Sequence, residues 1–510
     1  MGIILDRTID YVIIVAYLIG IAIFGVVSGG KQKSAKDYFL GAKAVPWWAV
    51  CFSIVASETS TLTFISIPGV AYLTNLNFLQ LTLGYLIGRV VIAYFFLPQY
   101  YKGELSTAYA FLENRFGVKT RSFASVVFLL TRTLADGVRL FAAAIPLKLM
   151  LNINYPVAIA IIACVTLIYT YTGGVKGVIW VEVIQMFIYL GGAAIAGIFL
   201  LQLLPEGWTS VVNAAAPNNK LNVINWGFEN GISGFFSTPY TFIGGILGGT
   251  FLSMASHGTD QIIVQRLLTA KNLSGGRKAI IGSGIIVIVQ FALFLCVGLA
   301  LYAYYGPMNV KSDEIFPKFI LDVLPVGISG IIIAGLFSAA MSTLAGSMSA
   351  LSSSTMLDLF KNYFKKHNVD DKKELRISRI VTIVWAGILV LSAIFFMNSS
   401  RAVVELALSI ASFTYGGLLG TFLLGLFVKK ATQEDALAGF TSGIFVMITV
   451  ISLKLVAWTW YTIIGVATTM FIGWFLSKLS VRKDEIPDKS NGTAIAREKL
   501  APAVNENKNS

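Results

Sequence analysis

The segment Ala56-Ser57-Glu58-Thr59-Ser60-Thr61-Leu62-Thr63 decides the architecture of this chain, because it places six polar side chains within eight positions of an otherwise apolar run. Pro68 and Gly69 follow within one to two helical turns. Polar side chains and unpaired backbone groups are costly in lipid. The segment therefore predicts a helix that breaks near the middle of a membrane and exposes backbone carbonyls to a cavity, an arrangement that holds ions and solutes in secondary transporters.

For the hydroxyl groups alone, a second interpretation fits equally well. Ser and Thr side chains can donate to a carbonyl one turn back in their own helix, which permits a tightly packed and unbroken helix. Glu58 favours the broken helix, because a carboxylate at this depth needs a cation or an arginine beside it.

The composition places the whole chain in a membrane. Of its 510 residues, 56% are apolar and only 13% are charged, and the mean hydropathy is +0.75. A soluble protein has about 25% charged residues, so lipid must solvate most of this surface. A membrane span needs about 20 mostly apolar residues. Thirteen such runs can be counted, near 8–28, 46–72, 76–100, 121–147, 154–172, 178–204, 236–257, 277–304, 327–356, 377–397, 401–427, 434–455 and 457–477.

We therefore expect an all-α integral membrane protein with one transmembrane domain, residues 1–480, followed by a polar and disordered cytoplasmic tail, residues 481–510. The first apolar run lacks a basic leader and a small-residue cleavage site, so we expect it to be a retained helix rather than a signal peptide. Three Cys in apolar stretches and two His argue against a disulfide framework and against a histidine metal centre.

Basic residues predict the orientation. With the amino terminus outside, 29 of the 39 Lys and Arg residues fall in cytoplasmic segments, seven in external segments and three within spans. Because basic residues concentrate on the cytoplasmic side, we expect a plasma-membrane protein with an external amino terminus and a cytoplasmic carboxyl terminus. This distribution accounts for the net charge of +13 without nucleic acid as a partner. The basic loop 361–379 is likewise expected to set topology rather than to bind a ligand.

A second polar span follows much later in the chain. Between Ser338 and Ser354, 13 of 17 residues are Gly, Ala, Ser or Thr, which close helix packing alone would explain. Ala339, Ser342 and Thr343 share one helical face, however, and offer a carbonyl and two hydroxyls. Sodium is a hard cation that takes several oxygen ligands, which need not be charged. Two carbonyls from the broken span would complete a five-oxygen sodium site.

Charged residues inside the spans give weaker signals. Arg132 and Asp136 are four residues apart on one helix, so we expect them to pair. Arg139 is left over, and it either pairs with Glu58 or faces the path of a solute. Arg89, in the third span, is unpaired in the same way.

Two connections between spans contain further motifs. Thr172-Gly173-Gly174-Val175-Lys176-Gly177 is expected to be a tight glycine-rich turn, and it lacks the spacing of a phosphate-binding loop. Asp260-Gln261 and Val264-Gln265-Arg266 begin a segment, 259–278, that is expected at the solvated cytoplasmic end of the seventh span.

Taken together, these residues resemble the sodium:solute symporter family, whose members carry sugars, sialic acid, proline, pantothenate and monocarboxylates. The resemblance covers about residues 8–480. It is carried by Tyr38-Phe39-Leu40-Gly41, by the segment 172–180, by Asp260 through Arg266 and by the ninth span. The family implies a leucine-transporter-type fold with two inverted repeats of five helices, here about 46–204 and 236–427, one extra helix before them and two after. That number agrees with the thirteen runs counted independently.

The resemblance also implies a sodium site between the second and ninth spans. Its ligands fall on the carbonyls of Ala56, Thr59 and Ala339 and on the hydroxyls of Ser342 and Thr343, and each position holds a competent group.

Some relatives bind a second sodium ion beside the first. The matching positions in this chain are Glu182, Ala345 and Gly346, where two hydroxyls are absent and the carboxylate is longer than the family's aspartate. We therefore expect one sodium ion per transport cycle.

The expected solute-binding residues lie on the second, third, fourth and seventh spans. They are Glu58, Ser60, Thr63, Phe78, Thr82, Arg139, Ser253 and His257. For the aromatic and hydroxyl groups among them, packing is an equally good explanation. Glu58 with Arg139 suggests a zwitterionic or carboxylated solute, unless the two neutralise one another. Proline-carrying relatives have an Asp at the position of Glu58, which argues mildly against a sugar.

The expected function is therefore sodium-coupled import of a small organic solute, such as a carboxylate or an amino acid, by alternating access. A sodium/sugar symporter is the alternative within the family. A channel is a rival from another class, but the chain has no loop like a selectivity filter. A carrier coupled to protons through Glu58 is a further rival. We see no Ser–His, Cys–His or metal constellation and expect no enzyme activity, and we expect no obligate protein partner besides solute, sodium and lipid.

Overall fold

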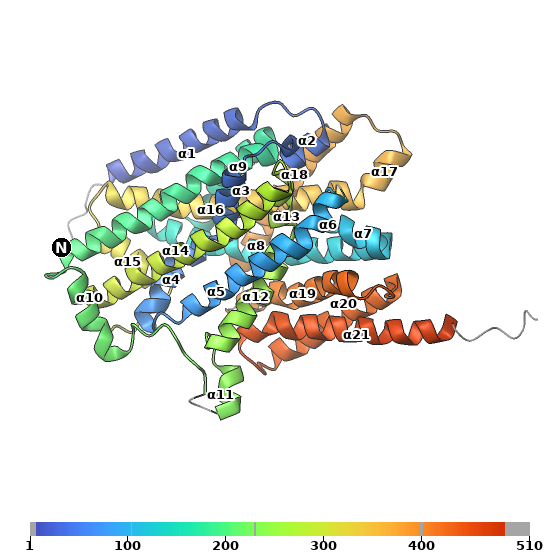
Figure 1. Cartoon of the computed structure of the whole chain (residues 1–510). Helices are drawn as coiled ribbons and strands as arrows, with labels where there is room; N and C mark the ends of the chain where they lie inside the picture. Colours follow the sequence, from blue (N-terminus) through green and yellow to red (C-terminus); the bar gives the residue numbers. More distant parts are fainter. Residues whose placement is uncertain (1–6, 104, 152, 229–230, 398–400, 485–510) are drawn as a thin grey trace, which may run out of the picture.

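The structure is a computed structural model that describes residues 7–103, 105–151, 153–228, 231–397 and 401–484. In these residues all regular structure is helical, apart from one isolated β-bridge between Val45 and Ala270. The long helices run roughly alongside one another, with α1 (Thr8–Gly29) at one edge and α20 (Gln433–Ser452) and α21 (Tyr461–Asp484) at the opposite edge (Figure 1). The expected all-α architecture is confirmed.

Eight helices of the described residues are long and apolar enough to cross a membrane, and nine if a bent pair counts as one span. The bent pair is α3 (Trp47–Glu58) and α4 (Thr61–Leu73). The remaining long helices are α5 (Phe78–Val91) continued by η2 (Ile92–Phe96) and α6 (Leu97–Lys102), α8 (Val118–Leu151), α9 (Tyr155–Leu203), α12 (Phe242–Gly258), α14 (Leu273–Tyr305), α16 (Ile328–Ser354) continued by η4 (Thr355–Leu359), α18 (Asp371–Met397) and α19 (Arg401–Phe427).

Short helices form the connections between them. They are α2 (Ala35–Leu40), η1 (Gly41–Lys43), α7 (Ala110–Phe116), α10 (Trp208–Ala215), η3 (Ala216–Asn218), α11 (Gly231–Ser237), α13 (Gln261–Thr269), α15 (Ile315–Asp322), α17 (Lys361–Lys366) and η5 (Trp458–Trp460). Of the expected disordered tail, residues 481–484 belong to α21, and residues 485–510 lie outside the described residues.

The turn expected at 172–177 is a single sharp residue inside α9. That helix has 49 residues, so at about 1.5 Å per residue it is more than twice as long as the hydrocarbon core of a bilayer. Gly174 alone departs from helical geometry, with φ 56° and ψ −163°. A Cβ atom at this position would lie 2.7 Å from the Tyr38 carbonyl oxygen. Glycine is therefore required where the two apolar halves of α9 meet.

The helices that surround the break pack closely against one another. Helix α5 packs against α12, and α14 packs against α3, α4 and α5. Small residues permit this approach: a Cβ atom on Gly88 would lie 2.5 Å from the Thr250 carbonyl oxygen, and one on Gly298 would lie 2.0 Å from the Pro68 carbonyl oxygen. Helix α16 packs against α8, α9 and α18, and α9 also packs against α3 and α14.

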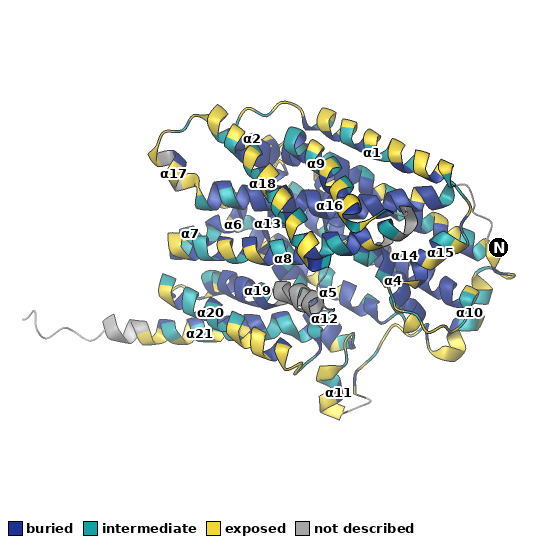
Figure 2. Ribbon diagram, turned by 180° about the vertical axis from the view of Figure 1, so that it is seen from behind, coloured by how far each residue is buried: buried dark blue, intermediate teal, exposed yellow. Residues whose placement is uncertain are grey.

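Helix α16 lies in the interior of the molecule. Of the 18 residues in the most apolar stretch of α16, 89% are buried, whereas only 22% are buried in the corresponding stretch of α1. Figure 2 shows α16 dark along its length, while α1, α20 and α21 carry exposed outer faces. Burial of this polar helix by neighbouring helices explains how its many hydroxyls avoid lipid.

The first turn of α16 is completed by a residue of α1. The buried carboxylate of Asp10 accepts hydrogen bonds from the backbone N–H groups of Gly327 (2.7 Å) and Gly330 (2.9 Å) and from Ser329 Oγ (2.7 Å). A carboxylate at a helix N-terminus satisfies free N–H groups and complements the helix dipole. The first helix therefore anchors one end of the helix that carries Ala339, Ser342 and Thr343.

Candidate functional site

The polar segment near residue 58 does break the helix. The axes of α3 and α4 differ in direction by 69°. Thr59 and Ser60 have extended backbone geometry, and Ser60 begins α4 as its N-cap, with its Oγ accepting from the Thr63 N–H at 3.3 Å. Because α3 ends here, carbonyls of its last turn are released from the regular helical pattern. The interpretation as an unbroken helix is wrong.

The break lies directly against α16. Ser342 Oγ donates to the Ala56 carbonyl at 3.0 Å and lies 3.1 Å from the Ala339 carbonyl oxygen, which also accepts from Thr343 Oγ1 at 3.1 Å. Ala56, Ala339 and Ser342 are fully buried, and Thr343 is 8% exposed. The structure thus brings four of the five expected sodium ligands within hydrogen-bonding distance of one another. Their oxygens are neutral, and hydroxyls can rotate to present lone pairs to a cation.

Thr59, the fifth expected ligand, follows α3 directly. Its side chain turns back toward α3, with Oγ1 donating to the Val55 carbonyl at 2.9 Å. Among the described residues, no hydrogen bond joins Thr59 to α16.

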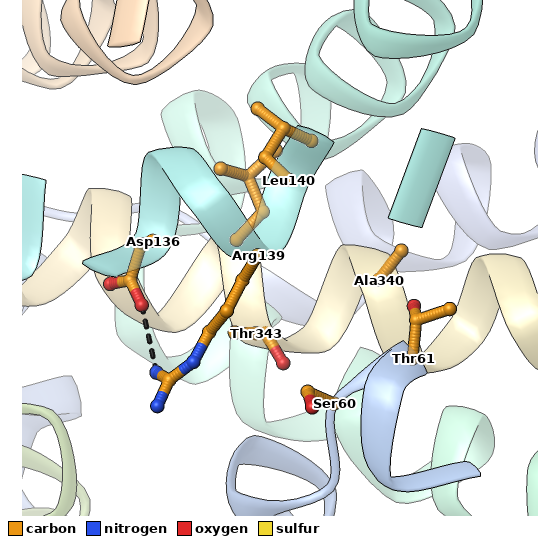
Figure 3. A pocket seen from close by; sticks show the side chains of 8 residues that line it. Ser60, Thr61, Asp136, Arg139, Leu140, Ala340 and Thr343 are labelled. Carbon is orange, nitrogen blue, oxygen red and sulfur yellow. Dashed lines mark hydrogen bonds and ion pairs between the residues drawn. The ribbon is translucent and has the colours of Figure 1, made fainter. Parts of the chain in front are cut away.

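A small cavity opens beside this oxygen cluster. Figure 3 shows Arg139 and the hydroxyl groups of Thr343 and Ser60 at the same cavity, with Arg139 paired to Asp136. The cavity is lined by Ser60, Thr61, Asp136, Arg139, Leu140, Ala340, Thr343 and Leu344. Thr343 therefore borders both the oxygen cluster and a cavity that contains an arginine.

A larger cavity shares Arg139 with the first. Side chains from six helices and from one residue between helices line it. They are Ser57, Glu58, Tyr85, Arg132, Arg139, Leu252, Ser253, Ser256, His257, Asp260, Ile262, Ile263 and Tyr415. Its polar lining is rich in charged and hydroxyl groups, as a binding site for a polar solute requires.

Glu58 is paired with Arg89. The fully buried Arg89 guanidinium forms an ion pair with Glu58 and donates to Ser283 Oγ at 2.7 Å. His257 Nε2 lies 3.0 Å from Arg89 Nη2 and 3.4 Å from Glu58 Oε2. The expectation that Arg89 is unpaired is wrong, and of the two alternatives for Arg139, pairing with Glu58 is the one that the structure does not show. The network joins α3, α5, α12 and α14.

A second charge network forms on the other side of the larger cavity. Arg132 pairs with Asp136 at 3.1 Å, as expected, and lies 3.7 Å from Asp260. Arg139 also pairs with Asp136, at 2.9 Å through Nη1, and its side chain is 30% exposed. Because Asp136 has a second arginine partner, Arg139 is the more available of the two cations for a bound anion.

Asp260 is not at a solvated helix end. The segment 260–270 is buried throughout, and Asp260 accepts a hydrogen bond from the Tyr415 hydroxyl at 3.1 Å. Asp260 lies between α12 and α13, where helical geometry is interrupted. The expectation that the segment 259–278 begins at a solvated helix end is therefore wrong for residues 260–270. Arg132, Asp260 and Tyr415 are lining residues that sequence reasoning missed, and the Arg132–Asp136 spacing was the available signal.

The expected solute-binding residues separate into two sets. Glu58, Arg139, Ser253 and His257 line the larger cavity, and Ser60 lines the smaller one with Arg139. Three residues lie outside both linings. Thr63 Oγ1 is 3.2 Å from Ser60 Oγ, the Phe78 ring stacks on Phe291 with centroids 4.9 Å apart, and the buried Thr82 hydroxyl donates to the Leu79 carbonyl at 2.8 Å.

Glu182 sits in a separate, fully buried ion pair. Arg266 donates to its carboxylate from Nε at 3.0 Å and also from Nη2. Ser57 Oγ donates to Glu182 Oε1 at 3.1 Å, and Ser53 Oγ donates to Glu182 Oε2. A Cβ atom on Gly346 would lie 2.9 Å from Arg266 Nη2, so the guanidinium fills the space between Glu182 and α16.

A family model described as the sodium:solute symporter family matches residues 38–443. The chain belongs to this family. It is therefore a multi-pass membrane transporter that couples solute movement to sodium, as the resemblance implied. The family membership places the two cavities and the oxygen cluster in a transport protein.

Similar proteins and solved structures agree with this assignment. The chain is 30% identical to the sodium/sialic acid symporter NanT of Aliivibrio fischeri, covering 95% of this chain and 96% of that protein. It is 29% identical to human sodium-coupled monocarboxylate transporter 1, covering 85% of this chain and 72% of that protein. A Na⁺-coupled sialic acid symporter solved in a substrate-bound, outward-open state matches with a TM-score of 0.82 at 27% identity, covering 92% and 98% of the two chains. Mhp1, a nucleobase-cation-symport-1 family transporter, shares the fold at 13% identity, with a TM-score of 0.57 over 89% and 96% of the two chains.

Proposed function

We propose that this sodium symporter carries a small carboxylated solute, and that the carboxylate binds at Arg139 beside the sodium ion. One observation supports the proposal above all: Thr343 borders both the oxygen cluster and the cavity that contains Arg139. An anion in that cavity would lie between Arg139 and the sodium ion. Opposite charges attract strongly where water is excluded, so each ligand would favour binding of the other.

The sodium ligands in this proposal are the carbonyls of Ala56, Thr59 and Ala339 and the hydroxyls of Ser342 and Thr343. Their positions fall on α3 and the residue after it and on α16, two helices that pack against each other. A sodium ion at this point would tie the two helices together. Rocking of one set of helices against the rest of the molecule, with the ion in place, is the alternating-access cycle that we propose.

The cavity charges favour an acid over an amine. Glu58 is paired with Arg89, and Asp136 with two arginines, so both carboxylates already have cationic partners. Arg139 engages Asp136 through a single nitrogen, which leaves donors of its guanidinium for a carboxylate. The relatives named for sialic acid and for monocarboxylates also carry acids. Glu58, Ser253 and His257 would contact the remainder of the solute.

We propose one coupling ion. Glu182, the carboxylate at the position that matches the second site, is neutralised by Arg266 and satisfied by Ser53 and Ser57. A second cation would have to displace a fully buried guanidinium, which is costly.

We further propose thirteen spans with an external amino terminus and a cytoplasmic carboxyl terminus. Division of α9 at Gly174, together with α8, α12 and α19 and the broken pair, extends the eight long apolar helices to that number. The two breaks, between α3 and α4 and between α12 and α13, support a repeated architecture, with repeats near 46–204 and 236–427.

Uptake by the purified protein in liposomes tests the proposal. A panel of carboxylic acids, amino acids and sugars is offered with external sodium or choline at fixed pH. We expect sodium-dependent uptake of an acid, and we expect Arg139→Met to raise its KM about tenfold or more, because one charge-assisted interaction is lost. Uptake that persists in choline would contradict sodium coupling. If a neutral solute is taken up in a sodium-dependent way and Arg139→Met has no effect, the proposed carboxylate site is contradicted, whereas sodium coupling is not.

A further inference from the structure

The helix break is held from behind by a chain of buried hydrogen bonds. Gln290 of α14 donates from Nε2 to Thr59 Oγ1 at 2.7 Å. Tyr189 of α9 donates from its hydroxyl to Gln290 Oε1 at 3.2 Å and lies 3.4 Å from the Val55 carbonyl oxygen. Thr59 and Tyr189 are 0% exposed and Gln290 is 1% exposed.

This arrangement goes beyond an ordinary threonine in a helix. Thr59 Oγ1 makes the usual bond to the carbonyl four residues back, at Val55. It also accepts a bond from a different helix, so its hydroxyl is used in both directions. Gln290 is likewise bonded at both ends of its amide, to Thr59 and to Tyr189. Loss of either partner would leave a buried amide atom without a hydrogen bond. These hydrogen bonds therefore link α3, α14 and α9 at Thr59, directly after the end of α3.

We propose that Gln290 and Tyr189 are positioning residues for sodium: they hold Thr59 so that the backbone of the break faces α16 before the ion arrives. The inference rests on the proposed sodium site. Neither side chain touches the ion in this proposal. Without the hold, the break samples conformations that do not bind sodium, and the apparent affinity falls in proportion to the fraction of molecules in the competent conformation. Saturating sodium restores that conformation and with it the transport rate.

The test measures initial uptake rates against sodium concentration for the full-length protein in liposomes. Gln290→Leu removes the amide at nearly constant volume, Tyr189→Phe removes one hydroxyl, and Thr59→Val removes the accepting oxygen. We expect Gln290→Leu and Thr59→Val each to raise the sodium concentration at half-maximal rate by about tenfold, the factor that one buried hydrogen bond supplies. For Gln290→Leu, the rate at saturating sodium and the solute KM measured there should not change.

The double variant Thr59→Val/Gln290→Leu separates this role from general damage. Both substitutions remove the same bond, so the double variant should need no more sodium than the single variants. A merely structural role would lower the amount of folded protein and the maximal rate, and leave the half-maximal sodium concentration unchanged.

Thr421→Val is the matched control. Thr421 of α19 is also fully buried, and its Oγ1 donates to the carbonyl four residues back, at Gly417, at 2.8 Å. We expect this variant to keep the sodium dependence of the unmodified protein. If Gln290→Leu does not fold, Tyr189→Phe carries the test, since it deletes a single oxygen.

Three results would overturn the inference: an unchanged half-maximal sodium concentration in the three single variants, additive effects in the double variant, or a raised solute KM at saturating sodium. The last would make Gln290 a solute ligand. Failure of the proposed function is distinguishable, because it would appear in the unmodified protein as uptake that does not depend on sodium.

Discussion

At the scale of single residues, Ser342 is the side chain that joins the two polar helices. Its hydroxyl bonds to the Ala56 carbonyl of α3, whereas Thr343 bonds within α16 only. We therefore expect Ser342→Ala to weaken sodium binding by roughly 10- to 100-fold, because it removes one oxygen ligand and one interhelical bond. Thr343→Ala should weaken sodium binding less. The measurement is the half-maximal sodium concentration for uptake. Thr343→Ser, which retains the hydroxyl, is the control, and equal sodium dependence in all variants would refute the site.

The Glu58–Arg89 pair gives a second prediction at this scale. Arg89 is fully buried, so Glu58→Gln leaves a guanidinium without its counter-charge. Removal of one partner of a buried pair costs about 3–5 kcal/mol, whereas removal of both costs less. We expect the double variant Glu58→Gln/Arg89→Met to unfold at a higher temperature than Glu58→Gln alone, measured in detergent without solute. A double variant less stable than either single variant would show that the pair does not act as a unit.

How far sequence reasoning reached depends on whether a contact is local. Ala339, Ser342 and Thr343 share a helical face, which fixes their relation whatever surrounds them, and Arg132 with Asp136 follows the same rule. Arg89 and Glu58 are 31 residues apart and meet because two helices pack side by side. Nothing in the spacing of such residues indicates their partner, and for this reason the sequence left open whether Arg139 pairs with Glu58.

At the scale of helices, close approach between α14 and α4 gives the third prediction. A Cβ atom on Gly298 would lie 2.0 Å from the Pro68 carbonyl oxygen, which is backbone and cannot move aside cheaply. We expect Gly298→Ala to force these helices apart and to destabilise the protein by about 1–3 kcal/mol, the range for an overpacked interior. Thermal unfolding and uptake both report the effect.

Gly191→Ala in α9 is the control for that prediction. No atom outside its own helix backbone and chain neighbours lies within 4 Å of the position its Cβ would take, and alanine favours a helix over glycine by about 1 kcal/mol. This variant should be as stable as the unmodified protein or more so. A Gly298→Ala variant that behaved in the same way would disprove the packing argument.

The helices themselves were largely predictable, since runs of apolar residues mark where lipid replaces water. Their interruptions were less so. The break at residues 59–60 was signalled by six polar side chains in a row of eight. The break at residues 259–260 carries one acidic residue beside an apolar run, which is also the pattern of an ordinary helix end, and only the packing of α13 against α3 and α16 shows that it is internal.

At the scale of the whole molecule, the proposed stoichiometry determines how transport responds to voltage. One sodium ion with one monocarboxylate anion carries no net charge, so the membrane potential does no work on the pair. A zwitterion with one sodium ion, or an anion with two, would move one positive charge, worth about 2.3 kcal/mol per 100 mV. We expect solute accumulation in liposomes to be unaffected by a potassium diffusion potential and to have a sodium Hill coefficient of about one. Accumulation that rises with an inside-negative potential would contradict this stoichiometry.

The attachment of Asp10 to the beginning of α16 has a practical consequence. The carboxylate supplies acceptors for two backbone N–H groups and a hydroxyl at the start of the helix that carries Ser342. Deleting the first helix, or fusing a rigid partner directly against it, would unseat the helix that carries three of the proposed sodium ligands. Purification tags and fluorescent reporters therefore belong at the carboxyl end of the chain, and a minimal version trimmed to the two proposed repeats should not be expected to transport.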